Sequence, residues 1–296
     1  KAGDLVITQP LTFVATCNVI YHMGAKPIFV DVSIDTLSLC PKALQQFLHQ
    51  HAKTDPHGCY LRTTGQRIVA VMPMHTFGHP AALDELLQVC REWQLLLVED
   101  AAESLGSFYK DKHTGTVGQF AALSFNGNKI ITTGGGGMLL CANEADGTKA
   151  KHLTTTAKVP HRWEFYHDEP GFNYRMPNLN AALGCAQIES LSYFLQQKRK
   201  VAMHYKAFFS DSDYQFVDEP AQCRSNFWLN AIICPSQTSR DKLLQSTNDA
   251  GVMTRPVWQL MHRLPAFRKA VRGDLCNAES IASRLINLPS SVTESV

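Results

Sequence analysis

Apolar and polar positions along the first half of the chain predict strands and helices in alternation. Short apolar runs bounded by polar or glycine residues predict strands, and stretches of helical spacing separate them. We expect strands at 5–8, 26–30, 67–72, 95–98, 121–125 and 138–141, and helices at 12–23, from Pro41 onward and at 81–93. Nearly continuous apolar strands joined by helices are typical of a mostly parallel sheet covered on both faces. The sequence therefore predicts an α/β fold with its functional residues at the carboxyl ends of strands.

The second half of the chain follows a different pattern. Residues 54–66 are predicted to form a loop, and the long polar and aromatic stretch 151–176 is predicted to be a loop that serves as an intersubunit arm. Asn178 is expected to cap a helix that runs to Phe209. Further elements are expected at 228–234 (strand), 239–250 (helix) and 278–286 (helix). We therefore predict a large domain at 1–177, a linking helix at 178–209 and a smaller C-terminal α+β domain at 210–296.

Composition and charge narrow the functional classes. The chain has 296 residues, 45% of them hydrophobic, and a formal net charge of +2, which provides no electrostatic basis for binding nucleic acid or a membrane surface. No apolar run approaches the roughly 20 residues needed to span a bilayer. The nine cysteines are scattered without paired spacing, which favours reduced thiols and a cytoplasmic location. The histidines show no metal-ligand spacing, and we predict no metal site.

Candidate chemistry is concentrated between Leu95 and Leu140. The apolar run 95–98 ends in Glu99 and Asp100, and the run 120–125 ends in an Asn-Gly-Asn-Lys turn that contains Lys129. A carboxylate at one strand end and a lysine just beyond another suit a cofactor that has an aldehyde and a ring nitrogen. Taken alone, Asp100 can also be read as a helix N-cap and Lys129 as a solvated surface lysine.

The motifs in combination are more specific. The chain contains EDAAES, then SFNGNK and four consecutive glycines, together with GHPAALDEL and GFNYRMPNLNAALGCAQ. Over nearly its whole length it resembles the sugar aminotransferases that use pyridoxal phosphate (PLP) and have the aspartate aminotransferase fold, of the DegT/DnrJ/EryC1/StrS type. The four glycines are not a phosphate loop, because no Gly-Lys-Ser/Thr follows, and we expect them to provide tight backbone packing.

The resemblance implies a role for each matching residue. Lys129 should bond covalently to the cofactor aldehyde and later carry a proton, and Asp100 should pair with the protonated ring nitrogen. Ser124 should donate to the cofactor phosphate, and Phe13 should stack on the ring, although a core phenylalanine remains the alternative. Asn173 should reach the cofactor phosphate of a partner subunit, which implies a homodimer with shared active sites.

Some positions depart from the family pattern or remain open. Glu103 stands where the family often has a glutamine bonded to the phenolic oxygen, and an ionised glutamate cannot donate to a phenolate. His75 and Arg255 are substrate-contact candidates because they lie in predicted loops near the sugar nucleotide. The upstream family loop whose backbone amides hold the phosphate does not precede Lys1, so we expect family residues to be missing from both ends of the sequence.

The resemblance implies an aminotransferase that moves an amino group from L-glutamate to C4 of a nucleotide-linked 4-keto-6-deoxy sugar. The stretch 152–178 resembles most the branch that acts on UDP-2-acetamido-4-keto-2,4,6-trideoxyhexose. A GDP-perosamine synthase is the alternative within the family. A non-transaminating PLP sugar enzyme and a cofactor-free α/β binding protein are the other classes, and Lys129 argues against the first because its known members replace this lysine with histidine.

Overall fold

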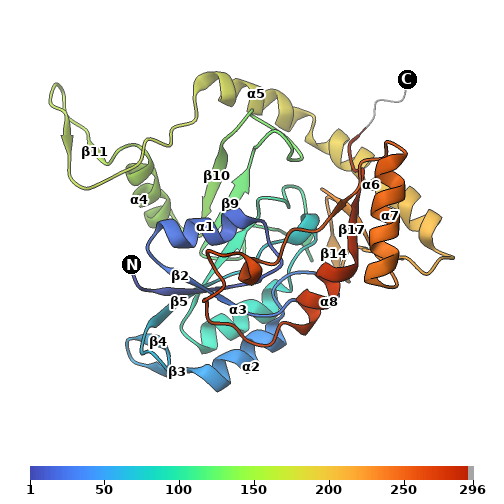
Figure 1. Ribbon diagram of the computed structural model, residues 1–296. Coiled ribbons are helices and arrows are strands. Elements are labelled where there is room, and N and C mark those ends of the chain that lie inside the picture. The colour runs from blue at the N-terminus through green and yellow to red at the C-terminus, as the bar shows by residue number, and fades with distance from the viewer. Residues whose placement is uncertain (293–296) are drawn as a thin grey trace.

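A mostly parallel sheet forms the centre of the computed structural model, which describes residues 1–292 (Figure 1). Its strands are β1 (Leu5–Thr8), β2 (Lys26–Phe29), β3 (Ala52–Asp55), β4 (Gly58–Leu61), β5 (Arg67–Met72), β6 (Leu96–Asp100), β9 (Phe120–Ser124) and β10 (Gly137–Cys141). Strands β2, β1, β5, β6 and β9 are neighbours in that order and parallel, whereas β10 is antiparallel to β9. The prediction of a mostly parallel α/β sheet is confirmed.

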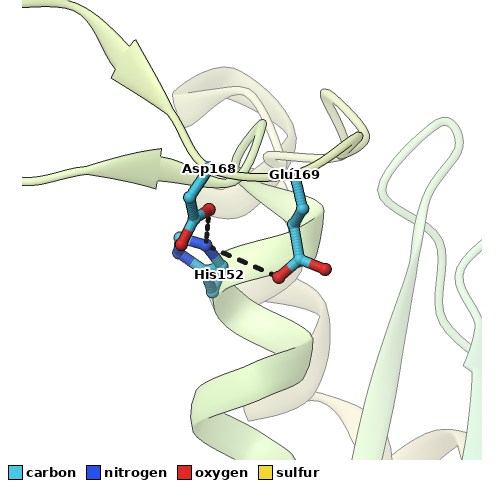
Figure 2. Close-up of side chains that lie close together, drawn as sticks. All are labelled: His152, Asp168 and Glu169. Atoms are coloured by element: carbon cyan, nitrogen blue, oxygen red, sulfur yellow. Dashed lines mark hydrogen bonds and ion pairs between the residues drawn. The ribbon is translucent and has the colours of Figure 1, made fainter.

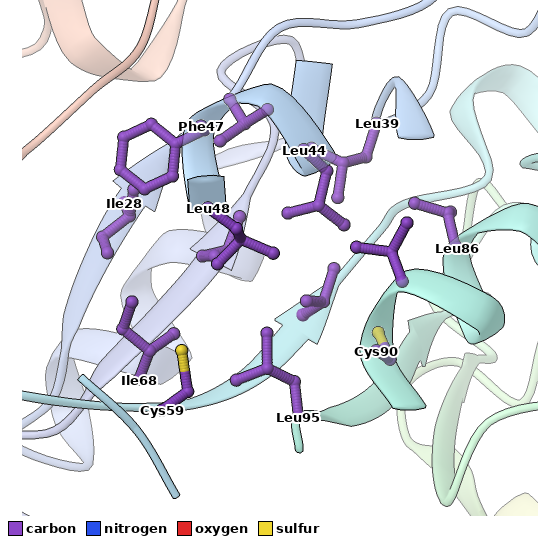
Figure 3. Packing of buried hydrophobic residues seen from close by; sticks show 14 of the residues in the cluster. Ile28, Leu39, Leu44, Phe47, Leu48, Cys59, Ile68, Leu86, Cys90 and Leu95 are labelled. Carbon is purple, nitrogen blue, oxygen red and sulfur yellow. The ribbon is translucent and has the colours of Figure 1, made fainter. Parts of the chain in front are cut away.

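Helices cover both faces of this sheet. Along β1, Leu5 and Ile7 pack with the side of the sheet that carries α2 (Pro41–His51) and α3 (Leu83–Glu92), and Val6 packs with Ile20 of α1 (Val14–His22) on the other side. Successive strand residues point to opposite faces, so the apolar continuity of the strands follows from burial on both sides. Figure 3 shows the core between α2, α3 and the sheet, which includes Leu44, Phe47, Leu48, Leu86 and Cys90.

The segment predicted as a loop at 54–66 forms a hairpin instead. Strands β3 and β4 pair antiparallel, and β4 also pairs with β5. The prediction was wrong because Asp55-Pro56-His57-Gly58 is a turn and not the centre of a longer loop. Cys59 and Leu61 on the second strand are buried and join the core of the main sheet.

The arm predicted at 151–176 is shorter than expected. Helix α4 (Glu144–Thr154) occupies its start, and a short hairpin of β11 (Lys158–Val159) and β12 (Tyr166–His167) projects from the molecule (Figure 1). Asn143 caps α4 by accepting the Asp146 N–H at 2.9 Å, a signal that was present in the sequence. The helix was missed because it buries no residue and therefore has no apolar stripe.

The predicted linking helix is divided in two. Helix α5 (Asn178–Glu189) and helix α6 (Leu191–Phe209) meet at Ser190, whose N–H bonds to the Gln187 carbonyl at 3.2 Å. This i to i−3 bond interrupts the helical ladder. Pro177, and not Asn178, is the N-cap residue of α5.

A smaller antiparallel sheet occupies the C-terminal part. Its strands are β13 (Gln215–Phe216), β15 (Asn230–Ile233), β17 (Leu285–Leu288) and β16 (Arg255–Pro256), in that order, with helices α7 (Gln237–Asp249) and α8 (Cys276–Arg284). The final helix was predicted to reach residue 286, but it ends at Arg284 and β17 begins at once. The sheet and its helices form the expected α+β arrangement.

The two halves of the chain are joined by shared packing. Strand β14 (Cys223–Arg224) pairs with β7 (Phe108–Tyr109), which pairs with β8 (Lys112–His113). One buried cluster combines Leu11 and Phe77 of the first half with Val217, Trp228 and Leu285 of the second. The C-terminal part therefore contributes directly to the surroundings of the candidate site. No helix within residues 1–292 has the length and apolar character to cross a membrane.

Candidate active site

Asp100 is the last residue of β6, at the carboxyl end of the parallel sheet. Its Oδ2 accepts a hydrogen bond of 2.6 Å from the Thr16 hydroxyl on α1, and its Oδ1 accepts the Ala102 N–H at 3.2 Å. Its backbone bonds to the Pro73 carbonyl and to the His75 N–H. Asp100 does not cap a helix, because a turn follows it. The carboxylate is therefore held in one orientation and remains partly exposed.

Lys129 lies in the turn that follows β9, the next strand of the sheet. Its Nζ is 3.7 Å from Oε1 of Glu103 and 4.1 Å from the ring centre of Trp228. The side chain is 12% exposed, so the amine is not the solvated surface group that the sequence alone allowed. The structure thus brings together a lysine and two carboxyl groups from turns at the same end of neighbouring strands.

Glu103 is buried beneath Lys129. Its Oε2 accepts the Phe77 N–H at 2.9 Å, and its Oε1 has no hydrogen-bond partner among the described residues. Burial raises the pKa of Glu103 to about 8, against the opposing effects of the Lys129 ammonium and the Phe77 N–H, while Asp100 raises it further. Phe77 adopts a φ of 58°, and strained backbone of this kind concentrates at functional sites. Burial therefore favours the protonated form of Glu103.

A buried hydrogen bond between Glu99 and His75 supports the end of β6. Glu99 Oε2 lies 3.0 Å from His75 Nε2, and the Glu99 carboxylate accepts three backbone N–H groups of Gly115, Val117 and Gly118 at 2.7 to 2.8 Å. Burial alone would raise the pKa of Glu99, but these donors outweigh it and lower the pKa to about 2. The carboxylate therefore fastens the 115–118 loop to the strand that carries Asp100.

His75 does not lie in an open loop as the sequence led us to expect. It is fully buried, its Nδ1 accepts the Ala81 N–H at 3.0 Å, and its Nε2 faces Glu99. With both ring nitrogens occupied inside the protein, His75 has no atom left for substrate. We therefore correct its role to a structural partner of Glu99.

Two of the predicted cofactor-binding residues, Ser124 and Phe13, lie on different elements of the fold. Ser124 ends β9, in the same layer of strand ends as Asp100, and its Oγ accepts the Asn126 N–H at 3.4 Å. Phe13 precedes α1, is 49% exposed, and meets the Trp258 ring edge-on with 6.2 Å between centroids. It is therefore not a core phenylalanine.

Asn173 and Arg255 are not in contact with Lys129. Asn173 is exposed and forms an isolated bridge with Thr155 at the base of the arm. Arg255 is exposed on β16, where its guanidinium donates to Asn248 and to the Thr254 carbonyl. The single chain therefore assembles Asp100, Glu103 and Lys129, and leaves Asn173 and Arg255 at its surface.

Two residues of the site were missed by sequence reasoning. Thr16 was hidden because its contact with Asp100 spans 84 residues, and Trp228 was hidden because its contact with the Lys129 turn spans about 100. A threonine in a helix and a tryptophan near a strand are ordinary core residues by pattern. No local signal in the sequence would have found them.

Comparisons with known proteins decide the family. The model of the DegT/DnrJ/EryC1/StrS aminotransferase family matches residues 1–294. The chain belongs to this family. It is 36% identical over 297 residues to EpsN of Bacillus subtilis (strain 168), assigned as a pyridoxal phosphate-dependent aminotransferase, with 98% of this chain and 73% of the relative covered. It is 33% identical to the GDP-perosamine synthase of Escherichia coli O157:H7, with 97% of this chain and 74% of that enzyme covered.

A solved aminotransferase structure is similar over the same range. The aminotransferase TlmJ from Streptoalloteichus hindustanus superposes with a TM-score of 0.86 at 27% identity, over 98% of this chain and 74% of that one. The chain is thus a PLP-dependent sugar aminotransferase, as the resemblance implied.

The residues present fit pyridoxal phosphate. Asp100 offers a carboxylate for a protonated ring nitrogen, and Lys129 offers an amine for an aldehyde. The unpartnered, buried Oε1 of Glu103 lies beside that amine and is available to a third polar atom. An unsatisfied buried oxygen is costly unless a ligand or water completes it. These observations are consistent with a cofactor seated across the ends of β6 and β9.

A separate polar cluster lies at the base of the arm and not at this site. His152 Nε2 lies 2.7 Å from Asp168 Oδ1 and 3.9 Å from Glu169 Oε1, and Figure 2 shows the three side chains turned toward one another. Among the described residues this is the group with metal-ligand geometry, but Lys149 already forms an ion pair with Glu169. The cluster is best explained as an ion-pair network that fastens the arm to α4, and it gives no support to a metal site.

Two surface cavities also lie away from Lys129 and Asp100. One of about 370 Å³ is lined by α2 and the 272–274 segment, and one of about 400 Å³ lies between α7, α8 and the segment that carries Trp258.

Proposed function

We propose that this enzyme transfers the amino group of L-glutamate to C4 of a nucleotide-linked 4-keto-6-deoxy sugar, with UDP-2-acetamido-4-keto-2,4,6-trideoxyhexose as the acceptor. The observation that carries the proposal is the Lys129–Glu103 pair, 3.7 Å apart beside Asp100, in a chain of this family. Pyridoxal phosphate supplies the electron sink that allows an amino group and a carbon-bound proton to be exchanged.

The residues of the chain have distinct tasks in this proposal. Lys129 binds the cofactor aldehyde and, once released, holds and returns the proton at the reacting carbon. Asp100, oriented by Thr16, keeps the ring nitrogen protonated. Glu103, with its pKa raised to about 8 chiefly by burial, donates its O–H to the phenolic oxygen as a glutamine amide does. Ser124 donates to the phosphate from the neighbouring strand end.

GDP-linked sugar is the second candidate acceptor. Several curated relatives of 30–33% identity are GDP-perosamine synthases, from Escherichia coli O157:H7, Caulobacter vibrioides and Vibrio cholerae. Their names favour an acceptor with the same 4-keto-6-deoxy pattern on a guanosine nucleotide. The amino donor and the reacting carbon are shared between the two candidates.

An absorbance experiment tests the function and separates the candidates. Addition of L-glutamate to the purified holoenzyme should convert the long-wavelength band of lysine-bound cofactor into the shorter-wavelength band of the pyridoxamine form. Subsequent addition of either 4-keto sugar nucleotide should restore the first band, and the sugar that restores it faster is the acceptor. A band that no amino donor shifts would identify a non-transaminating enzyme, and the lack of any band would identify a cofactor-free protein.

We also propose a homodimer with shared active sites. The arm and α5 expose a set of large apolar side chains, which comprises Trp163, Phe165, Tyr166, Tyr174 and Leu179. Their exposed fractions range from 60% to 87%, and a group of large exposed apolar side chains of this kind marks an interaction surface. Asn173 lies in the same region and is exposed. A second copy of the chain would cover this surface and bring Asn173 to the partner's cofactor.

Mixing two inactive variants should restore activity if the sites are shared. Lys129→Ala and Asn173→Ala each damage both sites of their own homodimer, but a mixed dimer contains one site in which both residues are intact. After reassortment of equal amounts, we expect about one quarter of the wild-type activity, because half of the dimers are mixed and half of their sites are complete. The measurement is the transaminase rate before and after denaturant-assisted exchange. No gain on mixing would show that Asn173 serves its own chain.

A further inference from the structure

Trp228 is the residue that touches Lys129 from the C-terminal half of the chain. It lies between β14 and β15 and is 6% exposed. Its ring centre is 4.1 Å from Lys129 Nζ, well within the range of a cation–π contact, and tryptophan provides the strongest such contact of the aromatic residues. Apart from the 3.7 Å approach to Glu103, the lysine amine has no other close polar contact within residues 1–292.

Three hydrogen bonds hold Trp228 in place. The ring Nε1–H donates to the Asn128 carbonyl at 2.7 Å, in the same turn as Lys129. The backbone carbonyl of Trp228 accepts a hydrogen bond of 2.8 Å from Lys198 Nζ on α6, and its backbone N–H donates to Asn226 Oδ1 at 2.8 Å. A side chain fixed at both its backbone and its ring loses little further entropy when it holds a cation.

The same segment also holds the Glu103 turn. The Asn226 amide donates to the carbonyls of Glu103 and Leu105 at 2.8 and 2.9 Å. Gly78, at φ +94°, allows this approach, because a Cβ there would lie 1.8 Å from Asn226 Oδ1. The segment 226–228 is therefore hydrogen-bonded both to the turn that carries Glu103 and to the turn that carries Lys129.

We propose that Trp228 is a positioning residue that holds the amine of Lys129 over its ring whenever the lysine is not bonded to the cofactor. Released by the incoming amino group, the lysine would otherwise sample several rotamers, whereas the ring keeps it beside Glu103 and the reacting carbon. The inference rests on the role proposed for Lys129 above. It gives the C-terminal half a part in placing the amine that carries the proton.

The test measures the reactivity of Lys129 in the full-length protein after hydroxylamine has removed the cofactor. Trace acetic anhydride labels free amines, and peptide mass spectrometry quantifies Lys129. Trp228→Leu should increase the labelling of Lys129 about tenfold, because the ring no longer stabilises the ammonium, and Trp228→Phe should increase it about threefold. Trp93→Phe, at the C-terminal end of α3, is the control and should leave the labelling of Lys129 unchanged. In the holoenzyme the bound cofactor should prevent the acetylation of Lys129.

A fluorinated series separates the electrostatic effect from a packing effect. Fluorine withdraws electron density from the indole ring with little change in shape, so it weakens cation–π contacts progressively. In a background with Trp93, Trp163 and Trp258 replaced by phenylalanine, labelling of Lys129 should rise with each fluorine added at Trp228. A flat series overturns the proposal.

If Trp228→Leu or the triple background fails to fold, Trp228→Phe decides. Wild-type labelling of Lys129 in folded Trp228→Phe, judged by an unchanged melting temperature, overturns the proposal. These labelling results do not involve the cofactor, whereas the proposed role of Lys129 is tested by fixation of the cofactor. The failure of one is therefore distinguishable from the failure of the other.

Discussion

Replacement of Lys129 by alanine is expected to abolish the borohydride-dependent fixation of pyridoxal phosphate to the chain. Borohydride makes the lysine–cofactor bond permanent, so a chain without the bonding lysine should release all cofactor on denaturation. The transaminase rate should fall by at least about 10²–10⁴-fold, because the same amine carries the proton in the reaction. Mass spectrometry of the intact chain and of its peptides measures the fixation.

Lys198 is the main competitor for this assignment. It is the other lysine that is largely buried, and burial lowers its pKa to about 8, which leaves a sizeable free-amine fraction at neutral pH. It is occupied with the carbonyls of Trp228 and Ser290, so we expect no cofactor on it. Cofactor fixed to Lys198 in the Lys129→Ala variant would refute the role given to Lys129. The exposed Lys200 provides a control, because Lys200→Ala should behave as wild type.

Glu99→Gln is expected to destabilise the cofactor-free protein by about 3–5 kcal/mol at pH 7.5. The carboxylate accepts three backbone N–H groups and faces His75, all inside the protein. The amide would retain one acceptor oxygen and turn a donor toward groups that also donate, which leaves buried N–H groups unpaired. Chemical denaturation followed by circular dichroism measures the free energy of unfolding.

The lowered pKa of Glu99 also predicts how the stability of the protein depends on pH. The donors to Glu99 outweigh burial and lower its folded pKa to about 2, below the unfolded value of about 4.5. The unfolded chain therefore binds the proton first as the pH falls, and the contribution of Glu99 is present above about pH 4.5 and lost toward pH 2. Glu99→Gln should show a smaller loss of stability over this range, by about 3 kcal/mol.

Glu92→Gln is the matched control for this experiment. Glu92 is an exposed residue at the end of α3, and its carboxylate accepts only a surface hydrogen bond from Gln88. Its substitution should change the free energy of unfolding by no more than about 0.5 kcal/mol. If Glu99→Gln were as stable as Glu92→Gln at pH 7.5, the buried network would not stabilise the strand end.

The accuracy of the sequence predictions followed the strength of the local pattern. Strands β1 and β5 were predicted with their exact bounds, and β2, β6, β9 and β10 to within one or two residues, because each coincides with a nearly continuous apolar run. Helix α4 was missed because its packing does not create an apolar stripe. The hairpin of β3 and β4 was missed because its turn residues resemble those of a loop.

The candidate site divides in the same way. Asp100 and Lys129 were predictable because each follows a recognisable apolar run in a motif of fixed spacing. His75 was misplaced because a histidine after a strand reads equally well as a ligand or as the buried partner of an acid. Which of these it is depends on Glu99, 24 residues away, and on the folding of the 115–118 loop around that acid.

The sequence by itself determined the family, the cofactor and the strand ends at which the acid and the lysine stand, because these depend on short motifs and on the order of strands and helices. Only the tertiary structure decided what surrounds them. The hydrogen bond from Thr16 to Asp100, the raised pKa of Glu103 and the ring of Trp228 over Lys129 arise from contacts between segments far apart in the chain. The burial of a side chain, its hydrogen bonds and the electrostatic field around it depend on which segments pack together, and no local pattern of residues specifies that packing.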